Sequence, residues 1–113
     1  MIPSRANYKD HTRGDTIGKR SFTITRTVDN VTSALDLVGA EIRADFVLPG
    51  YKVSKSIGNG ITLNNASNGQ FEIDSFTLDH VGIWEYDIQI KFSDETVNTL
   101  VKGSIKILND VTK

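Results

Sequence analysis

The stretch GIWEYDIQIK, residues 82–91, decides the fold class of this 113-residue chain. Large apolar side chains occupy every second position, and polar side chains occupy most of the positions between them. The apolar set is Trp84, Tyr86, Ile88 and Ile90, continued by Phe92. A period of two is the pattern of a β-strand with one face buried and the other in solvent. We therefore predict a strand that opens at Gly82 and directs Trp84 into the core.

Two other stretches repeat this alternation. In residues 40–48 the apolar face holds Ala40, Ile42, Ala44, Phe46 and Leu48, and the polar face holds Glu41, Arg43 and Asp45. In residues 97–107 one face of a last strand holds Val97, Thr99, Val101, Gly103, Ile105 and Ile107. The turn Ser93-Asp94-Glu95 is expected to join this strand to residues 82–92 as a hairpin.

Shorter strands are predicted in the remaining sequence. We expect them at residues 20–28 with Phe22, Ile24 and Val28 or a near neighbour inward, 52–57, 61–63, 70–73 with Phe71 and Ile73 inward, and 75–78, with an extended or partly looped segment at 31–38. Turn signals separate these segments at Asp29-Asn30, Pro49-Gly50, Asn59-Gly60, Asn68-Gly69 and residues 79–82. Asn59-Gly60 in particular predicts a tight hairpin into residues 61–63.

The composition also favours an all-β fold. Val, Ile and Thr together number 32, against 12 Ala and Leu, and β-branched residues favour strands. Seven or eight short strands around one tryptophan predict an immunoglobulin-like antiparallel β-sandwich over residues 20–113, with a small barrel as the alternative. We expect Trp84 in its core, and a sugar-stacking tryptophan is the alternative interpretation.

Residues 1–19 are expected to form an extended N-terminal arm. Residues 1–20 have a charge of +3 and residues 21–113 a charge of -4, so the charge is asymmetric. Pro3, Gly14 and Gly18 interrupt a segment that has almost no periodic apolar residues. Two interpretations remain open: a solvated tail, and an arm that becomes ordered against a neighbouring subunit.

Several classes of protein are disfavoured by composition. The chain has no cysteine, so disulfides, a thiol nucleophile and a cysteine-bound zinc ion are excluded. Its apolar runs are far shorter than the roughly 20 residues of a membrane-spanning helix. No secretory signal is evident near the N-terminus. We therefore expect no membrane partner and synthesis in a cytoplasm.

The sequence shows no motif with a catalytic mechanism. His11 and His80 lack metal-ligand spacing, and no phosphate-binding loop is present. Glu85 and Asp87 share one face of the central strand, where solvation is a commoner role than acid–base chemistry. The acidic body disfavours nucleic acid. We predict no catalytic residues, no cofactor-binding or metal-binding residues, no cofactor and no nucleic-acid partner.

Four stretches carry a resemblance to a known family. They are Arg13-Gly14-Asp15-Thr16, LDLVGAEIR at residues 35–43, GIWEYDIQI at residues 82–90, and TLVKGSIKI at residues 99–107 with the following Asp110-Val111-Thr112. Taken in order, they resemble a small β-sandwich of tailed-bacteriophage structural proteins, including the N-terminal domain of baseplate upper proteins. The resemblance spans nearly the whole chain. This sequence departs from the family at Trp84, where the family commonly has tyrosine, and in its longer N-terminal leader.

The resemblance implies a non-enzymatic virion protein that acts through protein–protein assembly. Such a protein would be a tail or baseplate component, or a capsid-associated decoration or adaptor protein, assembled in the host cytoplasm. Its expected partners are other phage virion proteins, with the chain either a homo-oligomer or an ordered part of a larger assembly. The rival function is recognition of a carbohydrate or cell-surface ligand through the loops at residues 57–60 and 64–69. An enzyme with His80 beside a carboxylate comes third.

Overall fold

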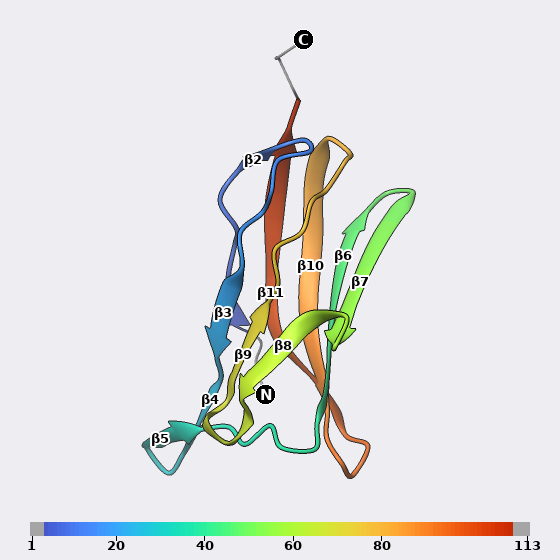
Figure 1. Cartoon of the computed structure of the whole chain (residues 1–113). Helices are drawn as coiled ribbons and strands as arrows, with labels where there is room; N and C mark the ends of the chain where they lie inside the picture. The colour runs from blue at the N-terminus through green and yellow to red at the C-terminus, as the bar shows by residue number, and fades with distance from the viewer. Residues whose placement is uncertain (1–3, 110–113) are drawn as a thin grey trace.

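The computed structural model describes residues 4–109, and this part of the chain is almost entirely β-structure (Figure 1). Its elements are β1 (Ser4–Arg5), β2 (His11–Thr12), β3 (Arg20–Thr23), β4 (Thr25–Val28), β5 (Val31–Ala34), β6 (Glu41–Leu48), β7 (Tyr51–Ile57), β8 (Gly60–Asn65), the 3₁₀ helix η1 (Ala66–Asn68), β9 (Gln70–Ile73), β10 (Gly82–Lys91) and β11 (Val97–Leu108). The predicted all-β fold is confirmed.

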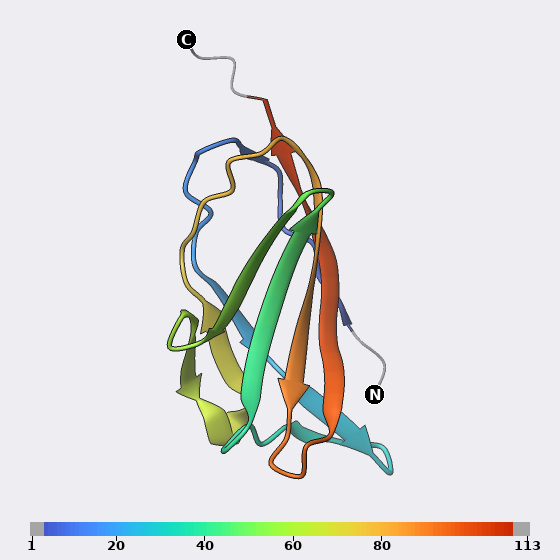
Figure 2. The ribbon, with the colours of Figure 1, turned by 90° about the vertical axis from the view of Figure 1, so that its right-hand side faces the viewer.

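One curled sheet makes up the body of the molecule. Its strand order is β1-β11-β10-β6-β7-β8-β9-β3, and β2 also pairs with β11. The sheet curls so that β3, β9 and β8 lie opposite β11, β10 and β6, which gives a sandwich-like arrangement (Figures 1 and 2). β1 and β3 end the sheet without pairing with each other, so the described strands do not close into a barrel. A separate hairpin, β4–β5, extends from one end of the body.

The core lies between the two layers and follows the predicted stripes. Trp84 is 1% exposed, and its indole N–H donates a 2.9 Å hydrogen bond to the carbonyl of His80. The prediction that Trp84 is a core residue is therefore confirmed. The other fully buried large side chains are Phe46, Phe71, Ile17, Leu37, Ile42, Ile61, Ile73, Ile88, Ile90, Ile105 and Ile107.

A β-bulge corrects the predicted face of the last strand. Ile88 pairs with Val101, but the next residue, Gln89, pairs with Thr99. Leu100 is the extra residue on β11, and both Leu100 and Val101 are buried. The prediction that residues 97 and 99 share the inward face was wrong, because the bulge reverses the alternation N-terminal to it.

The connection at residues 57–60 also differs from the prediction. β7 and β8 pair in parallel, so the expected hairpin at Asn59-Gly60 is wrong. Gly58 and Gly60 both have positive φ, 82° and 97°, a conformation that glycine adopts without a steric cost. After this loop β8 runs in the same direction as β7, and it then crosses to the opposite layer (Figure 1). The strand predicted at residues 75–78 is reduced to a single bridge between Phe76 and Ile17.

The N-terminal segment is packed on the body rather than extended away from it. β1 and β2 pair in parallel with β11, and the Tyr8 N–H donates a 2.9 Å hydrogen bond to the carbonyl of Ser104. Tyr8 and Ile17 are buried in the core. Gly103 permits this close approach, since a Cβ there would collide with the carbonyl oxygen of Ala6. Residues 4–19 are therefore neither a solvated tail nor an arm that waits for a neighbouring subunit, because they cover one edge of β11. The sequence did not reveal this, since the two buried residues Tyr8 and Ile17 are too far apart to form a periodic pattern.

Candidate interaction surfaces

The β4–β5 hairpin is exposed on both faces along its whole length. All eight of its strand residues are exposed, so the prediction that Val28 or a near neighbour shares the inward face of Phe22 was wrong. The predicted turn forms with positive φ at Asp29 (51°) and Asn30 (64°), as in the two-residue turns that match strand twist. Val28 and Val31 pair directly across the hairpin and are 50% and 65% exposed. We call these two valines the hairpin end of the molecule.

The base of the hairpin is fixed by the loop that follows β8. The Ile24 N–H donates to the carbonyl of Gly69 at 2.9 Å, and the Leu37 N–H donates to the carbonyl of Ala66 at 2.8 Å. Gly69 has φ 70°, and a Cβ at this position would collide with the carbonyl oxygen of Ile24. The loop at residues 64–69, one of the two expected sugar-binding loops, therefore supports the hairpin.

The other expected sugar-binding loop, residues 57–60, is held by backbone hydrogen bonds of its own. The Gly58 N–H donates to the carbonyl of Ile61 at 3.0 Å, and the Asn59 N–H donates to that of Ser56 at 2.8 Å. In both loops, glycine and asparagine serve the backbone geometry that turns require. These contacts give both loops a structural role.

A second group of exposed apolar side chains lies at the opposite end of the body. It consists of Val47, Tyr51, Val81, Ile83 and Leu108, which are 38% to 60% exposed. These residues come from the end of β6, the start of β7, the start of β10 and its preceding loop, and the end of β11. These strand ends lie together, away from the β4–β5 hairpin (Figure 1). We call this group the sheet end.

His80 packs beside the sheet end, against Tyr51. Its ring stacks on that of Tyr51 with centroids 3.6 Å apart and an interplanar angle of 18°. His11 lies on β2, where its Nδ1 is 2.8 Å from the carbonyl oxygen of Lys9. Within residues 4–109, no three or more His, Cys, Asp or Glu side chains are arranged to hold a metal ion.

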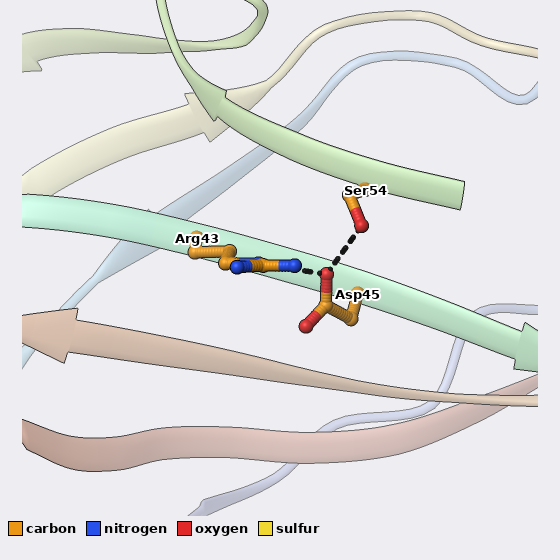
Figure 3. Close-up of polar contacts among 3 residues, drawn as sticks. All are labelled: Arg43, Asp45 and Ser54. Carbon is orange, nitrogen blue, oxygen red and sulfur yellow. Dashed lines mark hydrogen bonds and ion pairs between the residues drawn. The ribbon is translucent and has the colours of Figure 1, made fainter. Parts of the chain in front are cut away.

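The outer face of the layer formed by β6, β10 and β11 carries a row of charged side chains. Asp45 and Asp87 are direct cross-strand neighbours on β6 and β10. Asp45 Oδ1 accepts hydrogen bonds from Ser54 Oγ at 2.7 Å and from Arg43 Nε at 3.1 Å (Figure 3). Asp87 Oδ1 is buried without a hydrogen-bond partner among the described atoms. The sequence placed Glu85 and Asp87 on this face but could not show that Asp45 lies beside them, because that depends on strand register.

The two carboxylates titrate in opposite directions. Burial raises the pKa of Asp87, as does the negative charge of Asp45, against the opposing effect of Lys102 and other cations. Burial would also raise the pKa of Asp45, but the hydrogen bonds from Ser54 and Arg43 outweigh it and lower that pKa. Unequal carboxylates can serve acid–base chemistry; here both are partly buried, Asp45 is held by Ser54 and Arg43, and the charge of Lys102 opposes the shift of Asp87. The two neighbouring carboxylates therefore become charged over different pH ranges.

Comparison with known proteins identifies no relative. No family model matches the chain, and neither a curated protein nor a solved structure matches it. Among the helical residues of the described chain, no segment is long and apolar enough to cross a membrane.

Proposed function

We propose that this protein is a non-enzymatic structural component of a bacteriophage virion, assembled in the host cytoplasm. Within the virion it would be a tail or baseplate component, or a capsid-associated decoration or adaptor protein. It associates with copies of itself and with other virion proteins. The resemblance of its four sequence stretches to phage β-sandwich proteins supports the phage context. One structural observation supports assembly: of the ten large apolar side chains exposed among the described residues, seven lie at two opposite ends of an elongated domain.

The shape of the molecule makes this arrangement informative. The described residues extend over 54 × 28 × 23 Å, and the hairpin end and the sheet end lie at the two ends of the body (Figure 1). Clustered exposed apolar residues mark protein–protein contacts more often than single ones do. Because the two ends differ in structure, contact between them in successive copies is head-to-tail and generates a ring or a filament.

Contact with a partner would also stabilise the β4–β5 hairpin. A two-stranded hairpin exposed on both faces is marginally stable in water. Full burial of a valine contributes on the order of 1.5–3 kcal/mol, so covering Val28 and Val31, each half exposed or more, would contribute roughly 2 kcal/mol. Contact with the sheet end of another copy would therefore order the hairpin and link the subunits in one step.

Light scattering over a range of concentrations tests this proposal. We expect the wild-type protein to show a mass that rises with concentration in discrete steps. Val28→Asp and Val31→Asp should return it to a monomer, because a charge at the contact must be desolvated. Thr77→Asp, which adds the same charge at an exposed loop position, is the matched control.

Two results would contradict the proposal. If the wild-type protein is a monomer at every concentration, it does not self-assemble. If the oligomer persists in both valine variants, the hairpin end is not the contact. Specific binding on a glycan array that is lost on substitution of Asn59 would favour the carbohydrate-binding module instead.

A further inference from the structure

The gap between the two ends of the curled sheet forms a cavity of about 570 Å³. The segment that carries β1 and β2 forms one side of it, and β3 with the residues before it forms the other. A single side-chain hydrogen bond crosses this part of the molecule, from Arg20 Nη1 to the carbonyl of Asn7 at 3.0 Å. The lining includes no residue of the hairpin end or the sheet end, although His11 pairs with Ile107, next to Leu108 of the sheet end.

The lining of this cavity is cationic. Three cations, Lys9, Lys19 and Arg20, line it, and none of its lining residues is an aspartate or glutamate. Lys19 lies 3.7 Å from Glu72 but keeps 60% of its side chain exposed. The body of the protein is acidic outside this segment, so the cavity concentrates positive charge at one place. Concave surfaces lined by one sign of charge raise the local concentration of ligands of the opposite sign.

The cavity also borders an unpaired strand edge. β3 pairs with β9 along one edge, and no other strand of residues 4–109 pairs with its second edge. An extended peptide can add to such an edge through main-chain hydrogen bonds. A nucleic acid cannot use this edge in the same way. Tyr8, the larger aromatic ring in the lining, is buried, and the Arg20 guanidinium carbon lies 4.7 Å from its ring centroid, so only the partly exposed His11 imidazole is open to base stacking.

We propose that this cavity binds an acidic, extended peptide segment of a partner protein. The segment would pair with the free edge of β3 and place its carboxylates beside Lys9, Lys19 and Arg20. The inference rests on the proposed assembly function in that it assigns the ligand to a partner protein. It uses a different surface, however, and a protein that binds such a peptide as a monomer would support it even if end-to-end association failed.

An NMR titration of the full chain tests the inference. The probe is a capped hexapeptide of alternating glutamate and threonine, and a hexapeptide of alternating lysine and threonine is the charge control. We expect the acidic peptide to shift the amide signals of residues 16–23 and to slow hydrogen exchange on β3. The basic peptide should do neither. Raising the salt to about 0.5 M, where the screening length falls to about 4 Å, should weaken binding.

Charge reversal at the cavity provides the matched variants. Lys9→Glu should lower the affinity for the acidic peptide by about threefold or more, since it replaces an attraction with a repulsion. Lys106→Glu, an exposed lysine on the outer face of β11, should leave affinity unchanged. Shifts without slowed exchange on β3, or equal weakening by both variants, would overturn the inference. Tighter binding of an oligothymidylate than of the acidic peptide would also overturn it, in favour of nucleic acid.

Discussion

Replacing Tyr8 tests whether the N-terminal segment is part of the folded domain. Tyr8 is 9% exposed, and its ring packs against those of Phe46, Phe76 and Tyr86 with centroid distances of 6.1, 6.3 and 5.3 Å. Removing a buried aromatic ring costs about 3–5 kcal/mol. Because Tyr8 is anchored in a terminal segment that can relax, we expect Tyr8→Ala to lower the free energy of unfolding by about 3 kcal/mol, at the lower end of that range.

The hydroxyl of the same residue gives a second, opposite expectation. Tyr8 Oη is buried and has no hydrogen-bond partner among the described atoms. An unsatisfied buried hydroxyl costs about 1–3 kcal/mol. Tyr8→Phe keeps the ring and removes this atom, so it should leave stability unchanged or raise it by up to about 1 kcal/mol.

Urea unfolding measures both effects. Trp84 is the only tryptophan and is buried, so its fluorescence reports unfolding of the core. We expect the midpoint of Tyr8→Ala to fall well below that of the wild type, and that of Tyr8→Phe to equal or exceed it. If Tyr8→Ala costs less than about 1 kcal/mol, the N-terminal segment is a dispensable arm and the packing argument is refuted.

Three further predictions follow from the core and the outer face. Trp84→Ala should lower the free energy of unfolding by about 3–5 kcal/mol, measured by urea unfolding monitored by circular dichroism, and a cost under about 1 kcal/mol would contradict its place in the core. Gly103→Val should displace residues 4–8 from β11, because the new side chain would occupy the position of the Ala6 carbonyl; limited proteolysis should then cleave this segment faster, and an unchanged rate would contradict the contact. Asp87→Asn should raise stability at pH 7 by under about 1 kcal/mol. The raised pKa of Asp87 favours the folded state at low pH and loses this contribution as pH rises through the folded pKa, so the gain should vanish below about pH 4; a gain that persists there would contradict the assignment.

The central strands could be predicted because their burial is periodic. The alternation in residues 82–91 and 40–48 gave the correct inward faces, since a strand buried on one side imposes a period of two. The turn at Asp29-Asn30 was equally evident because its residue types tolerate positive φ. These features depend on local chemistry that a single segment contains.

The remaining features depend on contacts between distant segments. The bulge at Leu100 is set by pairing with β10, and nothing within residues 97–107 marks it. Tyr8 and Ile17 are anchors whose burial requires β11 and Phe76 to be in place. The sheet end is likewise assembled from four strands, so its five exposed apolar residues looked like isolated positions in the sequence.

Site-specific cross-linking tests end-to-end assembly most directly. The chain has no cysteine, so Thr32→Cys beside the hairpin end and Lys52→Cys beside the sheet end each introduce a single thiol into the protein. When the two variants are mixed and treated with a short bifunctional thiol cross-linker, head-to-tail contact predicts dimers that contain one subunit of each variant. Each variant treated alone should give few cross-linked dimers. Cross-linking of Thr32→Cys to itself as efficiently as to Lys52→Cys, or no cross-linking in the mixture, would contradict the account.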